Sequence, residues 1–305
     1  MRKEFETEYI WMDGKLVKWD EAKVHVLTHA LHYGTGVFEG IRGYWNGTQM
    51  YIFRLQDHIK RLINSAKVYG FDPVYDLNGW SRAILETIKA NNLKCNVYIR
   101  PLLIVGYGFI GLSLKDHEMQ AIVITLPFEK YFEKPGVHAM ISTWRRISEM
   151  SNPPSAKVTG HYTNSVLAKM EALNNGFDEA IFLDINGRVS EGSGENIFIV
   201  KNGVIYTPPP SCGILEGITR DTVIKIAREL GYRVVEKEIT RTELYLADEA
   251  FFTGTAAEVT PILSVDRRLI GNGEIGPITK ALKEKYERIV KGQEPKYMHW
   301  LTPVY

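Results

Sequence analysis

The chain has 305 residues, with 37 Lys plus Arg against 36 Asp plus Glu, so its formal charge is +1. This length suggests about two domains, and 45% hydrophobic with 24% charged residues excludes an intrinsically disordered chain. A near-neutral charge gives no electrostatic support for binding to nucleic acid or to an anionic membrane surface.

The cysteine content and the apolar segments indicate the compartment. Two cysteines, Cys95 and Cys212, cannot build a disulfide framework or a thiolate zinc site and are typical of a reducing environment. Residues 1–9 are charged and lack the apolar core of a signal peptide. The longest charge-free apolar stretch, 101–114, is too short to span a bilayer. We therefore expect a soluble, cytoplasmic protein.

Apolar periodicity and turn residues predict a mixture of strands and helices. Asn-Gly or Asp-Gly pairs between apolar or alternating runs predict four hairpins, at 13–14, 46–47, 186–187 and 202–203. Helical periodicity occurs at 57–69, 77–91, 162–174, 219–230 and 279–290, and buried strands are predicted at 98–105 and 120–126. The last two hairpins form a meander over 180–206.

A break in this pattern predicts the domain boundary. Residues 127–136, PFEKYFEKPG, have no consistent period and end in a Pro-Gly turn signal. We therefore expect a smaller α/β domain at 1–126, a linker at 127–136 and a larger domain at 137–305. Strands and helices do not alternate strictly, which favours a mixed α+β/α/β architecture over a doubly wound sheet.

Common nucleotide, hydrolase and metal signatures are absent from the sequence. Gly-x-Gly-x-x-Gly at 106–111 lacks a following helical pattern and is weak evidence. His25, His29 and His32 would share a helical face, but no carboxylate or cysteine cluster completes a metal site, and 24–31 alternates like a strand. We interpret these histidines as packed or hydrogen-bonded and predict no metal site.

Lys157 is the first residue that indicates chemistry. A lone lysine is usually a solvated surface charge, but this one lies in an otherwise uncharged segment, 151–168, before an apolar helix that starts near Tyr162. Burial lowers a lysine pKa and leaves the amine nucleophilic toward aldehydes, as a Schiff base requires.

Two further segments have both a structural and a functional interpretation. Glu191 lies in a glycine-rich turn that ends the strand 180–189; it is either an exposed turn acid or a carboxylate held against a cation. Thr219 follows a glycine at a helix start. Free backbone N–H groups there suit a phosphate, although a simple capped helix has the same sequence pattern.

In this order and spacing, these segments resemble the class IV aminotransferases, which are fold-type IV pyridoxal-phosphate enzymes, and especially the branched-chain amino-acid aminotransferases among them. The resemblance spans almost the whole chain. It is carried by seven motifs: YIWMDGKLVKWDEAKVHVLTHALHYGTGVFEGIRGY, FRLQDHIKRLINSAKVYGF, YIRPL, SAKVTGHYTNS, SEGSGENIF, GITRD and FFTGTAAEVTP.

The resemblance implies a pyridoxal 5'-phosphate cofactor and a role for each matching residue. Lys157 corresponds to the Schiff-base lysine, Glu191 to the partner of the pyridinium nitrogen, and Tyr162 to the hydroxyl near the phenolic oxygen. Arg61 corresponds to the phosphate-binding arginine. The other cofactor positions are Leu215 on the ring face and Ile218, Thr219 and Thr255 in the phosphate cup. The substrate-pocket positions are Tyr33, Phe38, Gly40, Tyr98, Arg100, Phe128, Tyr131 and Ala256.

The activity that the resemblance implies is transamination between leucine, isoleucine or valine and 2-oxoglutarate, in a homodimer or a larger homo-oligomer. D-amino-acid aminotransferase, amine transaminase and aminodeoxychorismate lyase are alternatives on the same fold. A catalytically silent binding protein is an alternative of another class. HALHYGTGVFEGIR, YIRPL and GTAAE together favour the branched-chain enzyme, and the presence of Lys157 argues against a pure binding protein.

Overall fold

The computed structural model describes residues 5–128 and 134–305. The chain forms two compact units, each with its own sheet. The first comprises Met1–Glu129, Ala156–Gly160 and Ile289–Tyr305, and the second comprises Lys130–Ser155 and His161–Arg288.

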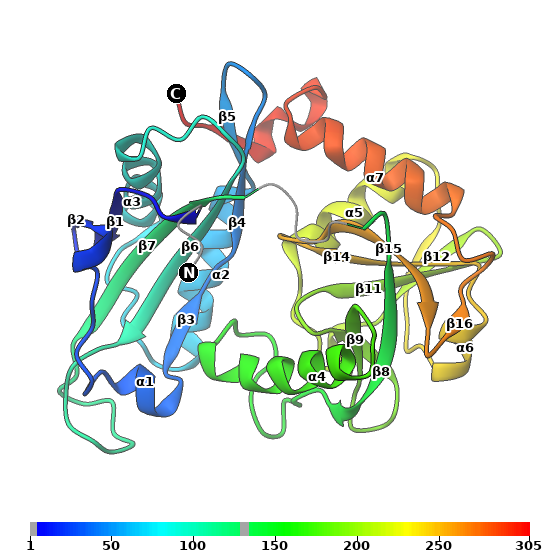
Figure 1. Cartoon of the computed structure of the whole chain (residues 1–305), viewed down its shortest axis with the longest axis horizontal. Helices are drawn as coiled ribbons and strands as arrows, with labels where there is room; N and C mark the ends of the chain where they lie inside the picture. Colours follow the sequence, from blue (N-terminus) through cyan, green and yellow to red (C-terminus); the bar gives the residue numbers. More distant parts are fainter. Residues whose placement is uncertain (1–4, 129–133) are drawn as a thin grey trace. The chain divides into compact units, whose positions relative to one another are not determined.

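The first unit is built on an eight-stranded antiparallel sheet in the order β17-β5-β4-β6-β7-β1-β2, with β3 also paired to β6. Its strands are β1 (Tyr9–Met12), β2 (Lys15–Lys18), β3 (Gly36–Phe38), β4 (Ile41–Trp45), β5 (Met50–Phe53), β6 (Val97–Val105), β7 (Met119–Pro127) and β17 (Leu301–Pro303). Its helices are α1 (His29–Tyr33), α2 (Leu55–Val68) and α3 (Leu77–Ala90), and α2 and α3 pack against each other. Figure 1 labels these elements.

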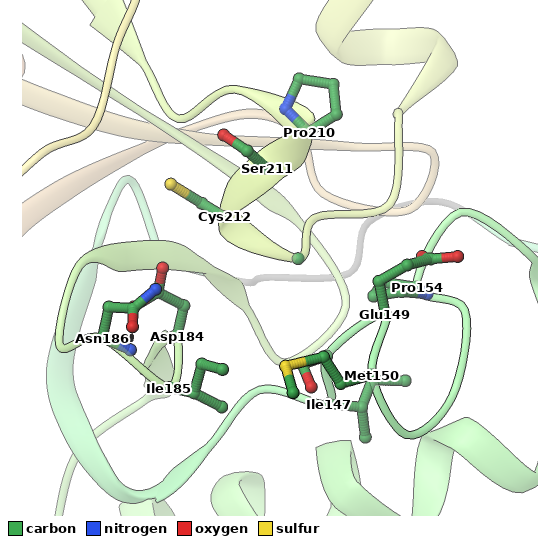
Figure 2. Close-up of a pocket in the computed structure, with 12 residues that line it drawn as sticks. Ile147, Glu149, Met150, Pro154, Asp184, Ile185, Asn186, Pro210, Ser211 and Cys212 are labelled. Atoms are coloured by element: carbon green, nitrogen blue, oxygen red, sulfur yellow. Dashed lines mark hydrogen bonds between the residues drawn. The ribbon is translucent and has the colours of Figure 1, made fainter.

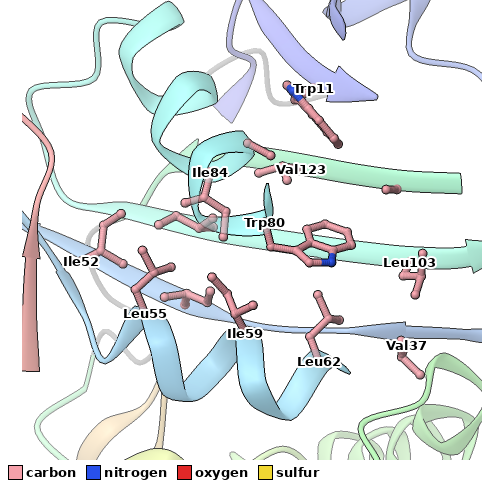
Figure 3. Close-up of a cluster of buried hydrophobic side chains, with 14 of the residues drawn as sticks. Trp11, Val37, Ile52, Leu55, Ile59, Leu62, Trp80, Ile84, Leu103 and Val123 are labelled. Atoms are coloured by element: carbon pink, nitrogen blue, oxygen red, sulfur yellow. The ribbon is translucent and has the colours of Figure 1, made fainter. Parts of the chain in front are cut away.

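Helix α2 has two buried faces of different chemistry. Leu55, Ile59 and Leu62 recur at helical spacing and pack in the hydrophobic core with Trp80 of α3, as Figure 3 shows. His58 and Ser65 are also buried, together with half-buried Arg61, at positions i, i+3 and i+7 on another face. The apolar face holds the helix in place, and the polar face is available for a site.

The second unit contains a nine-stranded sheet in the order β10-β9-β8-β15-β14-β11-β12-β13, with β16 paired to β15. An additional pairing of β10 with β11 closes six of these strands into a ring around a second apolar core. The strands are β8 (Val137–Arg145), β9 (Glu179–Leu183), β10 (Val189–Gly192), β11 (Asn196–Lys201), β12 (Val204–Thr207), β13 (Val234–Glu236), β14 (Glu249–Gly254), β15 (Glu258–Val265) and β16 (Arg268–Leu269).

Helices cover this second sheet. They are α4 (Tyr162–Asn174), α5 (Ile218–Glu229), α6 (Arg241–Tyr245) and α7 (Pro277–Val290). Helix α4 packs against β8 and β9, and α5 packs against β14 (Figure 1). Short 3-10 helices lie at Trp19–Glu21, Thr159–His161, Pro210–Cys212 and Pro295–Trp300. No helix in the described residues is long and apolar enough to cross a membrane.

Most predicted elements are confirmed. All five helices lie within two residues of their predicted ends, and the four hairpins form, those at 13–14 and 202–203 with two-residue loops. The strand suggested by alternation at 24–31 is wrong, because the chain enters α1 there. A helix of five residues is too short to show a helical period against that alternation.

The predicted domain 137–305 needs correction in two segments. Residues 156–160 belong to the first unit, because Val158 bridges Val37 and the Gly160 N–H donates to the Gly34 carbonyl. The C-terminal residues from 289 also belong there, since β17 pairs with β5. The central part of the predicted linker, 129–133, lies outside the described residues.

Candidate active site

Lys157 is anchored in the first unit by its backbone. Its N–H donates to the Ser65 hydroxyl on α2 at 2.9 Å, and its carbonyl accepts from the N–H of Phe38 at 3.1 Å. Its Nζ lies 4.9 Å from the centre of the Phe38 ring. The end of β3 and the polar face of α2 therefore fix the backbone from which this half-buried amine projects.

Arg61 lies on the same helix face and binds a buried carboxylate. Its Nε and Nη2 donate to the two carboxylate oxygens of Glu39 at 2.6 and 2.9 Å, and His58 contacts Glu39 Oε2 through Nδ1 at 2.7 Å. Burial opposes ionisation of Glu39, but the charge of Arg61 and the His58 contact outweigh it and hold the pKa well below its usual range. Glu39 is thus an anion inside the unit.

Candidate substrate residues gather next to the same strand end. Arg100 donates from Nη2 to the Tyr98 hydroxyl at 2.7 Å, and its guanidinium carbon lies 4.5 Å from the Phe38 ring centre. A Cβ on Gly40 would clash with that hydroxyl, so any larger residue would displace the Tyr98 ring. The Phe128 ring centre is 5.5 Å from that of Tyr98. The structure therefore brings this predicted set together.

Two further predicted pocket residues, Tyr33 and Tyr131, do not appear among these contacts. Tyr33 ends α1, is 38% exposed and packs against the ring of His29 at 4.5 Å. Tyr131 lies outside the described residues. His29 is hydrogen-bonded to Thr35 Oγ1 and the Gly111 carbonyl, which confirms the interpretation of this histidine as a packed residue.

In the second unit, Glu191 is held at the crossing of β10 and β11. Its Oε1 lies 2.8 Å from Arg146 Nε, and its Oε2 accepts from Asn196 Nδ2 and the Leu215 N–H, both at 3.0 Å. These partners are a cation and two N–H donors, and Glu191 is only 5% exposed. Of the two interpretations that the sequence left open for Glu191, the structure therefore supports a carboxylate held against a cation. Leu215 lies beside this carboxylate.

The start of α5 lies next to this carboxylate network. Ile218 and Thr219 form its first turn, and the cap residue Gly217 contributes no side-chain hydrogen bond. A Cβ on Gly217 would clash with Asn196 Oδ1, so glycine is required for this close approach. Backbone N–H groups in a first helical turn point along the axis and suit an anion.

The remaining predicted residues of the second unit lie at element ends. Tyr162 is the first residue of α4, and Thr255 with Ala256 forms the turn between β14 and β15. All three are half-buried. Their assignment to the site follows from the sequence motifs.

Sequence patterns did not reveal several charged residues around these sites. Glu39, Arg146 and Glu195 are each at most 7% exposed. Burial, reinforced by the negative charge of Glu179, raises the pKa of Glu195 to about 8. The sequence signal for Glu39 is a single charge between the buried strands 36–38 and 41–45. This signal does not identify the distant residue that pairs with the charge.

A separate pocket of about 300 Å³ lies in the second unit and contains none of the predicted site residues (Figure 2). Its walls are residues 147–150, 154, 184–186 and 210–213. Burial raises the pKa of Cys212, which lines it, to about 11, so the thiol is protonated and a poor nucleophile at neutral pH. The described residues hold no group of three or more His, Cys, Asp or Glu that could bind a metal.

Comparison with known proteins decides the family. Residues 36–265 match the family described as amino-transferase class IV, which is more than half of the chain. The chain belongs to the class IV aminotransferases. The predicted family is thereby confirmed, and the two-sheet fold is the one that solved branched-chain aminotransferases share.

Relatives of this class IV aminotransferase match over its whole length. A probable branched-chain-amino-acid aminotransferase of Aquifex aeolicus is 45% identical over 100% of this chain and 99% of its own. The crystal structure of a branched-chain aminotransferase from Thermoproteus uzoniensis with norvaline has a TM-score of 0.95 at 52% identity, covering 98% of this chain and 100% of that one. The enzyme of Thermobaculum terrenum in its PLP form has a TM-score of 0.94 at 42% identity, covering 98% and 99%.

Proposed function

We propose that this protein is a pyridoxal-phosphate-dependent branched-chain amino-acid aminotransferase, which transfers amino groups from leucine, isoleucine or valine to 2-oxoglutarate. The observation that carries the proposal is Lys157. It is the one charged residue of the segment 151–168, its backbone is fixed by Ser65 and Phe38, and it occurs in a chain that matches aminotransferases over its full length.

The donor set of the site fits pyridoxal 5'-phosphate. An amine suits the aldehyde, a buried carboxylate suits the ring nitrogen, and a guanidinium with a helix start suits the phosphate. The buried Glu191 carboxylate accepts two N–H bonds and faces Arg146, so it is held as an anion. When bound, this cofactor supplies an electron sink that stabilises negative charge at the substrate Cα.

The chain's own residues divide the remaining work. Glu191 would hold a protonated ring nitrogen by ion pairing, and Leu215 would contribute apolar contact to the ring. Lys157 Nζ would act as general base toward the substrate Cα–H and then as general acid that delivers the same proton to the cofactor carbon. The Tyr162 hydroxyl would contribute a hydrogen bond to the cofactor's phenolic oxygen.

Phosphate binding is assigned to four residues. Arg61 offers a planar set of N–H donors, as a lysine does not. Ile218 and Thr219 contribute the first turn of α5, and Thr255 contributes the turn after β14. All four offer side-chain or backbone donors, which supports recognition of a dianion.

The substrate pocket must accept both an apolar and an acidic side chain. Phe38 and Tyr98 supply aromatic surface for a branched aliphatic chain, and Arg100, in contact with both rings, supplies a cation for the second carboxylate of glutamate. We assign Tyr33, Gly40, Phe128, Tyr131 and Ala256 to the same pocket. This combination favours the branched-chain reaction over an amine or lyase reaction.

Assembly and location are also proposals. We infer a homodimer or a larger homo-oligomer, supported by exposed apolar side chains such as Phe109 and Leu112, 84% and 82% exposed. Neither Cys95 nor Cys212 forms a disulfide bond, which supports a reducing, cytoplasmic location.

The test is a coupled transamination assay with 2-oxoglutarate over a panel of L-amino acids, D-amino acids and primary amines. We expect leucine, isoleucine and valine to react fastest. Faster reaction with D-amino acids or amines would assign the alternative activities. The absence of cofactor absorbance in the purified protein, with no activity after adding pyridoxal 5'-phosphate, would favour a silent binding protein.

A further inference from the structure

A fully buried carboxylate lies directly behind the arginine assigned to the phosphate. Glu39 is 0% exposed, and each of its oxygens accepts from a different nitrogen of Arg61. Two parallel N–H···O bonds between a guanidinium and a carboxylate are stronger and more directional than a single contact. This pair therefore fixes the plane of the Arg61 guanidinium.

The carboxylate is itself held from several sides. The backbone N–H of Glu39 donates to the Pro101 carbonyl at 2.9 Å, and His58 Nδ1 contacts its Oε2 at 2.7 Å. His58 and Arg61 are one turn apart on α2, so both reach the same residue. Burial lowers the pKa of His58, and the charge and hydrogen bond of Glu39 oppose this shift.

We propose that Glu39 is a positioning residue for the cofactor phosphate, acting through Arg61. A guanidinium has five N–H donors, and two of them point at Glu39. A phosphate bound at Arg61 would accept from N–H groups of the guanidinium other than these two. The inference rests on the proposed function, because it requires a phosphorylated cofactor in this site.

Two effects of Glu39 oppose each other. Its negative charge disfavours a nearby phosphate, whereas its hydrogen bonds hold a long, flexible side chain in one orientation. Arg61 lies within 2.9 Å of the carboxylate and already compensates most of its charge. The orienting effect therefore dominates, and removal of the carboxylate weakens phosphate binding.

The experiment compares a ligand that has the phosphate with one that lacks it. The full-length chain is stripped of cofactor and titrated with pyridoxal 5'-phosphate and with pyridoxal, followed by absorbance. We expect Glu39→Gln to raise the Kd for pyridoxal 5'-phosphate by about tenfold or more and to leave the Kd for pyridoxal within about twofold. The matched control is Asp57→Asn, which removes a carboxylate from Arg54 at the start of the same helix and should change neither Kd.

A double variant tests whether the effect passes through Arg61. In an Arg61→Ala background, Glu39→Gln should cause no further loss of selectivity between the two ligands. If Glu39→Gln does not give a folded chain by circular dichroism, Glu39→Asp replaces it. The shorter side chain keeps the charge but cannot place both carboxylate oxygens on the two Arg61 nitrogens. The same selective loss is expected.

Three outcomes overturn the inference: equal weakening of both ligands, unchanged affinities, or tighter binding of pyridoxal 5'-phosphate. Each of these leaves the proposed function standing, provided that the wild-type chain binds pyridoxal 5'-phosphate. A wild-type chain that binds neither compound would overturn the proposed function and this inference together.

Discussion

Arg100 is the residue to which we assign recognition of the acidic substrate. Its guanidinium carbon lies 4.5 Å from the Phe38 ring centre and 5.2 Å from the Tyr98 ring centre, and its Nη2 donates to the Tyr98 hydroxyl. Within 5–128 and 134–305, no carboxylate forms an ion pair with it, so a purely structural role as an ion-pair partner has no support. A cation among aromatic rings is suited to a carboxylate that enters with substrate.

We therefore expect Arg100→Leu to slow the glutamate and 2-oxoglutarate half-reactions at least about tenfold more than the leucine half-reaction, because a carboxylate would be buried without a partner. Stopped-flow absorbance of the cofactor follows each half-reaction separately. Tyr98→Phe is the control, since it removes only the hydroxyl that Arg100 contacts. Equal losses for both substrates would assign Arg100 to the common α-carboxylate or to folding.

Glu195 gives the second unit a pH-dependent stability. Burial and the charge of Glu179 raise its pKa to about 8 from an ordinary value of 4.5. The folded chain therefore keeps a proton that the unfolded chain releases. The stabilising contribution is fully present below about pH 4.5 and is lost as the pH rises through 8.

A neutral substitute should remove this dependence. We expect the wild-type chain to lose about 1–3 kcal/mol more free energy of unfolding than Glu195→Gln between about pH 5 and 8.5. Urea unfolding of both chains at a series of pH values measures this difference. The contributions of all other titrating groups are the same in both chains and cancel. Parallel stability curves for the two chains would show that Glu195 titrates normally.

At the scale of single elements, α2 joins the core to the site. Leu62 is fully buried beside Arg61 and packs with Ile59 and Trp80 (Figure 3). Leu62→Ala should lower the free energy of unfolding by about 2–5 kcal/mol, because it leaves a cavity in a close-packed core. Chemical denaturation monitored by circular dichroism measures the change. The control Lys60→Ala, at an exposed position of the same helix, should stay within about 0.5 kcal/mol of wild type.

The predictability of each element follows from its length and its partners. Long helices, such as α2 and α4, repeat their apolar pattern often enough to be found from sequence. Helix α1 has five residues and ends at Gly34 in the left-handed region, φ 65°, so local alternation concealed it. The motifs located Lys157 and Arg61, but no local signal places Glu39 on Arg61, 22 residues away.

At the scale of the whole molecule, contacts between segments far apart in the sequence determine which unit a segment belongs to, and the sequence patterns do not predict these contacts. Residues 156–160 join the first unit through contacts with 34–38, which lie far earlier in the chain. The composition of 156–160 gives no sign of that partner, since the segment is too short to show a periodic pattern. A boundary based on turn signals alone therefore assigns Lys157 to the wrong unit.

An apolar stripe on α4 is a candidate contact surface for the homo-oligomer that we propose. Val166, Met170 and Leu173 are spaced i, i+4 and i+7 and are each 48–59% exposed, while Ala168 and Ala172 on the same helix are buried. A contiguous apolar stripe is costly to leave in water and is typical of an interface. If a second copy of the chain covers it, a charge in its centre should disfavour association.

We expect the wild-type protein to have at least twice the mass of the 34.8 kDa chain in light scattering coupled to gel filtration. Met170→Asp should lower that mass at the same concentration, because burying an unpaired carboxylate in an apolar contact is unfavourable. Asn174→Asp adds the same charge at the exposed end of α4 and should leave the mass unchanged. A wild-type mass of one chain would contradict the inferred homo-oligomer. An unaltered mass for Met170→Asp would show instead that this stripe lies outside the interface.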